Sequence, residues 1–175
     1  MTNLRGRLEL SDKPTDAGIS QASPGIWVLF TFFVAFTLNI ASSSVMWLPN
    51  FVGLAIVFWT FRQPETVGMA VAFLCGILID VVNGAVLGQH ALGLITLSYF
   101  TTVLSRRLQL FAPAGQALHI LPLLLVSQLL VMLVRLWLDG LWPGWEWFLQ
   151  SFSSALIWPL WIRFMQPHSL SQHVS

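Results

Sequence analysis

One acidic residue, Asp80, lies inside a hydrophobic segment and on a row of small residues spaced four positions apart. The row consists of Gly68, Ala72, Gly76, Asp80, Gly84 and Gly88. Because four residues make about one turn of an α-helix, these positions form a single slanting ridge. Small residues at this spacing let two helices approach closely in lipid, and a carboxylate among them is costly unless it has a partner or a role. The row therefore marks close helix packing at a charged position.

Two interpretations of Asp80 follow. In the favoured one it is a buried acid that pairs with a neighbouring helix, and the candidate partners are Gln128 and Arg135 in the fifth hydrophobic segment. In the other it is a proton or substrate site of a transporter. The row of small residues likewise has two interpretations. It packs either against this chain itself, which is favoured, or against a helix of a partner protein.

No established catalytic motif accompanies Asp80. The chain has no HExxH, nucleophile elbow, phosphate-binding loop, GxGxxG or CxxC pattern. Its histidines are scattered along the sequence, at His90, His119, His168 and His173. Cys75 is the only cysteine, so no disulfide forms within the chain. We therefore expect neither an enzyme nor a protein that binds a metal or cofactor.

The composition is that of an integral membrane protein. Of the 175 residues, 56% are apolar and 9% are charged, and the mean hydropathy is +0.76. Soluble domains carry about 25% charged residues. The net charge is only +1 and Lys13 is the single lysine, so there is no polybasic patch and we expect no nucleic-acid partner.

The hydrophobic segments predict an all-α bundle of six transmembrane helices, since a helix needs about 20 apolar residues to cross a bilayer. The predicted spans are 26–46, 48–62, 67–87, 91–105, 116–138 and 147–165. Together they form one transmembrane domain over residues 25–166. We expect a disordered polar tail at 1–24 and a short polar tail at 167–175. An even number of spans places both tails on the same side of the membrane.

The basic residues predict that this side is the cytoplasm. With cytoplasmic termini, all but one of the basic residues lie inside, namely Arg5, Arg7, Lys13, Arg62, Arg106, Arg107 and Arg163. Only Arg135 lies toward the outer face. We therefore predict a multi-pass membrane protein with both termini in the cytoplasm. Because its loops are short, it must act through its lipid-embedded surfaces or through an intramembrane cavity.

Several motifs resemble the rod shape-determining protein MreD family. The opening of the family is matched by WLPNF at 47–51 and FW at 58–59, and its central signature by FLCGILID at 73–80 and GAVLGQHAL at 84–92. A later landmark is matched by IWP at 157–159. Positions that match this pattern include Pro49, Trp59, Trp158 and Pro159. The likeness covers residues 45–165.

The resemblance implies a non-enzymatic subunit of the bacterial cell-elongation (rod) complex. Such a subunit is a multi-pass protein of the bacterial cytoplasmic (inner) membrane, where it binds the single-pass protein MreC directly. Through MreC it connects to the MreB filament, to RodA and to a class B penicillin-binding protein, and it helps to position lateral peptidoglycan synthesis. The resemblance also implies a fold similar to the substrate-binding subunits of energy-coupling-factor transporters, an analogy that says little about function. Self-association of the chain stays open.

The alternative function is a small-molecule carrier or the substrate-binding subunit of a membrane transporter. It predicts a polar cavity lined by hydrogen-bonding side chains. The sequence offers few candidates, chiefly Asn39, Asp80, Asn83, Ser127 and Gln128. The assembly role is therefore preferred, with the row of small residues on segment 67–87 as the predicted docking groove.

Overall fold

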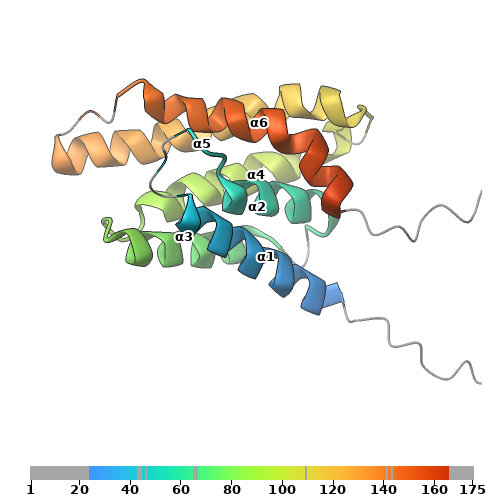
Figure 1. Cartoon of the computed structure of the whole chain (residues 1–175), viewed down its shortest axis with the longest axis horizontal. Helices are drawn as coiled ribbons and strands as arrows, with labels where there is room; N and C mark the ends of the chain where they lie inside the picture. The colour runs from blue at the N-terminus through green and yellow to red at the C-terminus, as the bar shows by residue number, and fades with distance from the viewer. Residues whose placement is uncertain are drawn as a thin grey trace, which may run out of the picture.

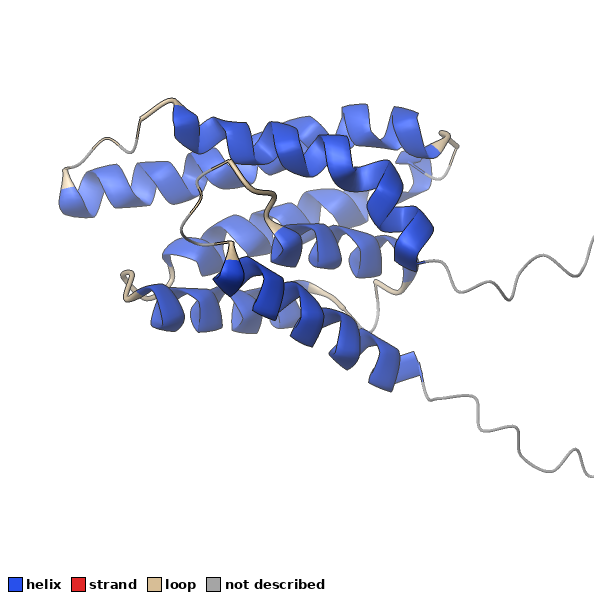
Figure 2. Cartoon of the chain, in the orientation of Figure 1, coloured by secondary structure: helices blue, strands red, loops and turns tan. Residues whose placement is uncertain are grey.

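The computed structural model describes residues 24–42, 45, 47–64, 67–108, 110–140, 142 and 144–165. Within these ranges the chain forms six α-helices and no strand (Figure 2). The helices are α1 (Pro24–Ala41), α2 (Phe51–Arg62), α3 (Met69–Asn83), α4 (Gln89–Leu108), α5 (Pro113–Asp139) and α6 (Glu146–Met165). The predicted tails lie outside the described residues, apart from Pro24 at the start of α1.

Consecutive helices run in alternating directions, so the start of α1 and the end of α6 lie at the same end of the bundle (Figure 1). We call this the terminal end, and we call the opposite end the distal end. Arg62, Arg106, Arg107 and Arg163 lie in the last turns of α2, α4 and α6, and so at the terminal end. Arg135 lies toward the distal end, in the last third of α5. Four of these five arginines thus lie at one end of the bundle and Arg135 lies toward the other, as the predicted alternation of the spans requires.

The helix α2 forms the centre of the bundle. It begins at Asn50, whose side-chain oxygen accepts a hydrogen bond from the Gly53 N–H at 2.8 Å. The residues 52–58 are all buried, because α1, α4 and α6 pack around them. Its 12 residues extend about 18 Å, against about 30 Å for the hydrocarbon core of a bilayer. The predicted second span is therefore a core helix, apolar on every side because protein surrounds it.

Length and apolarity distinguish α5 from the other helices. Among the described residues, only Pro113–Leu138 is both long and apolar enough to cross a membrane by itself. The helices α1, α2 and α3 are apolar but shorter. The prediction of six helices is confirmed. The stronger prediction was six full-length spans. In the part of the chain that the structure describes, α5 alone is long and apolar enough to support it.

The helix α3 is shorter than the predicted span 67–87. It ends at Asn83, because Gly84 adopts a left-handed conformation with φ of 60° and terminates the helix. The N–H of Ala85 then bonds the carbonyl of Asp80 at 2.9 Å. A second glycine with positive φ, Gly88 at 99°, completes the connection to α4. The chain therefore reverses direction where the sequence pattern predicts a continuing helix.

The row of small residues is consequently broken at both ends. Gly68 precedes the helix in an extended conformation, and Gly84 and Gly88 follow it. Only Ala72, Gly76 and Asp80 share a ridge on α3. The prediction of one continuous ridge from residue 68 to residue 88 was wrong, because a period of four persists in the sequence after the helix has ended.

Candidate functional site

The middle of the row packs α3 against α4. Ala72, Gly76 and Asp80 are all buried. A Cβ atom added to Gly76 would lie 2.2 Å from the Cα of Ala91 and 2.5 Å from its nitrogen. Because these are backbone atoms, only glycine permits the two helices to pass this closely. The ridge is therefore an internal packing surface of this chain and is not open as a groove for a partner helix.

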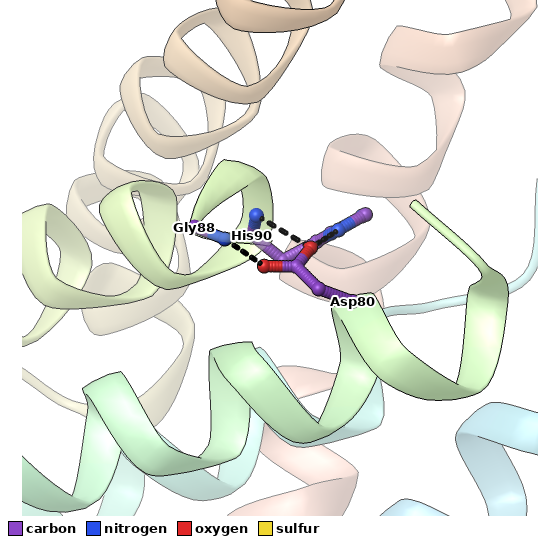
Figure 3. Close-up of polar contacts among 3 residues, drawn as sticks. All are labelled: Asp80, Gly88 and His90. Atoms are coloured by element: carbon purple, nitrogen blue, oxygen red, sulfur yellow. Dashed lines mark hydrogen bonds and ion pairs between the residues drawn. The ribbon is translucent and has the colours of Figure 1, made fainter. Parts of the chain in front are cut away.

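Asp80 joins the end of α3 to the start of α4 (Figure 3). Its side chain is fully buried. One carboxylate oxygen, Oδ2, accepts a hydrogen bond from the Gly88 N–H at 2.8 Å. The other, Oδ1, accepts from the His90 N–H at 3.0 Å and lies 2.7 Å from His90 Nδ1. We call Asp80, Gly88 and His90 the latch, because three donors on the α4 side hold one carboxylate on α3.

The latch also orients the imidazole of His90. A carboxylate can only accept hydrogen bonds, so Nδ1 carries the proton that it donates to Asp80. The second ring nitrogen, Nε2, has no hydrogen-bond partner within the described ranges. The ring is half-buried, with 19% of the side chain exposed. The latch therefore holds a ring in place and leaves its outer nitrogen available.

The predicted partners of Asp80 have other contacts. Gln128 on α5 donates to the carbonyl of Trp147 and to Gln150 Oε1 at 3.3 Å, and its own oxygen accepts from Ser151 Oγ. The guanidinium of Arg135 lies 5.5 Å from the centre of the Trp147 ring. Both residues thus connect α5 with the beginning of α6. Asp80 is held by the start of α4 and not by α5 as predicted, because the reversal at Gly84 brings α4 directly onto α3.

From the sequence, His90 is one of four scattered histidines, and its role was missed. A usable signal is the dipeptide Asn83-Gly84, a common turn and helix-end pattern. A helix that ends there, followed by one that begins at Gln89, returns the chain to the level of Asp80. The tight connection between α3 and α4 then brings His90 next to Asp80, which lies ten positions earlier in the sequence.

A cavity of about 430 Å³ opens beside the latch at the distal end. Its walls come from the ends of α1 and α3, the start of α4, the second half of α5 and the start of α6. Much of the lining is polar: Asn39, Ser42, Asn50, Asn83, Gln89, His90, Ser127, Gln128, Arg135, Gln150, Ser151 and Ser154. Polar side chains in a membrane protein typically face such a cavity. The distal cavity thus provides the feature that the carrier alternative predicts.

The four residues named from the family pattern lie beside the start of α2, near the end of α2, and inside α6. Pro49 is buried beside the cap of α2. Trp59 packs edge-to-face on Phe58, with ring centres 5.4 Å apart. Trp158 is 1% exposed and donates its indole N–H to Gln116 at 3.3 Å, and Pro159 lies inside α6. These four residues do not line the distal cavity.

Metal chemistry has no support in the described ranges, where no three His, Cys, Asp or Glu side chains are grouped as ligands. The imidazole of His90 and the carboxylate of Asp80 form one hydrogen-bonded pair. The arrangement is suited to holding helices together and to binding polar groups through hydrogen bonds.

Comparison with known proteins agrees with the motifs. The family described as rod shape-determining protein MreD matches residues 20–168. A curated relative, the rod shape-determining protein MreD of Haemophilus influenzae, is 31% identical over 138 residues, which cover 75% of this chain and 83% of the relative. No solved structure matches the chain. The expected likeness to transporter substrate-binding subunits therefore stays a prediction.

Proposed function

Because the chain belongs to the rod shape-determining protein MreD family, we propose that it is the membrane-embedded subunit of a bacterial rod complex that binds MreC directly. The family consists of non-enzymatic membrane proteins that maintain cell shape. In this proposal MreC links the chain to MreB, RodA and a class B penicillin-binding protein. The assembled complex then positions lateral peptidoglycan synthesis.

The proposed orientation places the terminal end in the cytoplasm. Arg62, Arg106, Arg107 and Arg163 lie at that end, and basic residues next to membrane helices favour the cytoplasmic side. Both termini are then cytoplasmic, and the distal cavity faces the outside of the bacterial inner membrane. MreB is reached from the cytoplasmic side, and peptidoglycan synthesis lies on the distal side.

The outward face of α3 is our proposed docking surface for the MreC helix. It consists of Phe73, Leu74, Leu78 and Val81, which are exposed by 45%, 61%, 54% and 62%. Their spacing forms one apolar stripe along the helix. The buried ridge with Gly76 lies on the other side of α3 and packs it on α4. The stripe replaces the row of small residues as the docking surface.

The observation that carries this choice is the short, fixed geometry of α3. Its 15 residues extend about 22 Å, less than the roughly 30 Å thickness of the hydrocarbon core. A short apolar helix is accommodated in a bilayer by local thinning or by association with another helix. The tight contact with α4 and the latch hold the stripe rigid, so a partner loses little conformational entropy when it binds.

Disulfide cross-linking tests the surface directly. In a Cys75→Ser background, single cysteines replace Leu74 or Leu78, and a matched control replaces Leu156, which is 80% exposed on α6. Cysteines along the transmembrane helix of MreC supply the other sulfur atom. We expect MreC cross-links from positions 74 and 78 in oxidised membranes and none from position 156.

The other outcomes are informative in different ways. Cross-links from position 156 alone would move the docking surface to α6. A cross-link between two copies of this chain at position 74 would assign the stripe to self-association. If no position cross-links and MreC does not co-purify, direct binding is wrong.

A second test measures cell shape after a larger side chain is placed on the proposed docking surface. We expect Leu78→Trp to round rod-shaped cells that depend on this chain, because the larger side chain prevents a partner helix from lying flat on α3. The matched Leu156→Trp variant should preserve rod shape. Immunoblots of the membrane fraction check that both variants accumulate equally, and rod-shaped cells with Leu78→Trp would contradict the proposal.

A further inference from the structure

We propose that the distal cavity binds a neutral group rich in hydroxyls and amides, of the kind that sugars carry. The central observation is Gln89, the first residue of α4, which lines the cavity and is only 4% exposed. Its side-chain amide makes no hydrogen bond to any residue that the structure describes. The amide atoms are accessible from the cavity, since the enclosed side-chain atoms without a partner in the described ranges are the indole nitrogens of Trp59, Trp147 and Trp161. A ligand with a donor and an acceptor would satisfy the Gln89 amide.

Other lining groups are available beside Gln89. Nε2 of His90 has no hydrogen-bond partner in the described ranges, and the latch holds the ring beside the cavity. The side-chain amide of Asn39, near the end of α1, is in the same situation within those ranges. Hydrogen-bonding groups from two separate helices thus meet at one cavity whose volume of about 430 Å³ suits a small polar molecule.

The lining chemistry selects the class of ligand. Amide side chains both donate and accept hydrogen bonds, as hydroxyl and N-acetyl groups do. A strongly anionic ligand typically requires several cationic groups, whereas the described lining contains Arg135 as its one guanidinium, and this group lies over Trp147. A cation would need an available carboxylate, and the Asp80 carboxylate is already enclosed by three donors. An apolar ligand would leave the amides unpaired.

Two sources can supply this chemistry. One is a free sugar from the solvent at the distal end, and the other is the sugar head group of a membrane glycolipid. The cavity lies at an end of the bundle, where solvent and lipid head groups both have access in the proposed orientation. The proposal concerns the hydroxyl- and amide-bearing group that both share, and it does not depend on MreC docking.

The experiment measures binding by the full chain in phosphatidylcholine nanodiscs. N-acetylglucosamine represents the free sugar, glucosyl diacylglycerol in the nanodisc represents the glycolipid, and inorganic phosphate represents an anion. Native mass spectrometry detects the lipid, and calorimetry detects the soluble probes. We expect one of the two sugar probes to bind, and we expect Gln89→Leu to weaken it by about tenfold, the factor expected for a loss of about 1.4 kcal/mol.

A matched control separates binding from folding. Gln116 is a buried glutamine near the start of α5, away from the cavity lining, and its amide is fully hydrogen-bonded. We expect Gln116→Leu to lower the melting temperature without changing sugar affinity. We expect Gln89→Leu to lose affinity without a lower melting temperature. If Gln89→Leu does not fold, Asn39→Leu must show the same loss of affinity.

The outcomes divide clearly. Binding of N-acetylglucosamine supports the proposal with a free sugar as the source, and binding of glucosyl diacylglycerol alone supports it with a lipid head group. The proposal is overturned if neither sugar probe binds to folded protein, if phosphate binds in their place, or if Gln89→Leu and Asn39→Leu bind as tightly as the unmodified chain.

Discussion

Gln116 and Gln89 are buried to a similar degree, at 8% and 4% exposure, yet they lie at opposite ends of the bundle and in opposite situations. At the terminal end, Gln116 donates to the carbonyls of Leu108 and Phe111 and accepts from Trp158. At the distal end, the Gln89 amide makes no hydrogen bond within the described ranges and faces the cavity. One residue type therefore stabilises the fold at one end and is available to a ligand at the other.

The surroundings of the two glutamines show the same contrast. Near the terminal end, the hydroxyl of Thr60 donates to the carbonyl of Val67 at 3.0 Å, so this buried polar group is satisfied within the chain. At the distal end, the latch satisfies Asp80 fully but leaves Nε2 of His90 without a partner among the described residues. The hydrogen bonds of Gln116 and Thr60 thus hold the terminal end together, although the indole N–H groups of Trp59 and Trp161 at that end have no partner among the described residues. At the distal end, part of the polar lining is left for other molecules.

We expect the largest loss of stability from Asp80→Ala at the distal end. The substitution leaves the N–H groups of Gly88 and His90 and the His90 ring without their acceptor. We expect a loss of about 4 kcal/mol in the free energy of unfolding, as for other buried pairs that lose one partner. Denaturant titration in detergent micelles measures it. Asp80→Asn, which keeps one acceptor oxygen, should lose clearly less, and equal losses would contradict the latch.

Gly76→Ala tests the packing that positions the distal end. The new Cβ would lie 2.2 Å from the Cα of Ala91, so we expect α3 and α4 to separate at a cost of about 3 kcal/mol in unfolding free energy. The control is Gly25→Ala near the terminal end, where nothing lies within 4 Å of the added atom. Gly25→Ala should be neutral or slightly stabilising in the same titration, and a neutral Gly76→Ala would refute the close contact.

Gln116→Leu tests the structural role at the terminal end. It removes three hydrogen bonds, and each is worth about 0.6 kcal/mol on average in membrane proteins. We therefore expect a loss of about 2 kcal/mol in the free energy of unfolding. Denaturant titration in detergent micelles measures this loss. If Gln116→Leu is as stable as the unmodified chain, the contrast between the two ends disappears.

The smallest expected effect on stability belongs to Gln89→Leu. Leucine removes an amide that faces the cavity and has no hydrogen-bond partner in the described ranges, so the free energy of unfolding should change by less than about 0.5 kcal/mol. Thermal unfolding of the ligand-free protein in nanodiscs measures this. A clear loss of stability would show that the Gln89 amide is already satisfied within the protein.

Much of the architecture was predictable because it rests on local features of the sequence. Apolar segments of suitable length predict all the helices, with the largest boundary errors at the ends of α1 and α3. The arginines predict that α2, α4 and α6 end on the same side of the bundle. The motifs predict the family, and comparison with known proteins confirms it.

The site was less predictable, since its contacts depend on how the chain reverses. A period of four continues through Gly84 and Gly88, although the positive φ of Gly84 ends the helix. Depth in the membrane favours Arg135 as the partner of Asp80, but the short connection between α3 and α4 places His90 beside the carboxylate. Neither result follows from hydropathy, because hydropathy is insensitive to the direction of a turn.

By itself, the sequence determined that this chain is a helical membrane protein of the MreD family, since apolar length, arginine position and motif order are properties of the chain. Only the tertiary structure decided that Gly76 packs against Ala91, that Asp80 is held by His90, and that Gln89 faces a cavity while Gln116 is satisfied. The physical reason is that close packing and hydrogen bonding depend on which helix faces are brought together, and that is settled only when the whole bundle assembles.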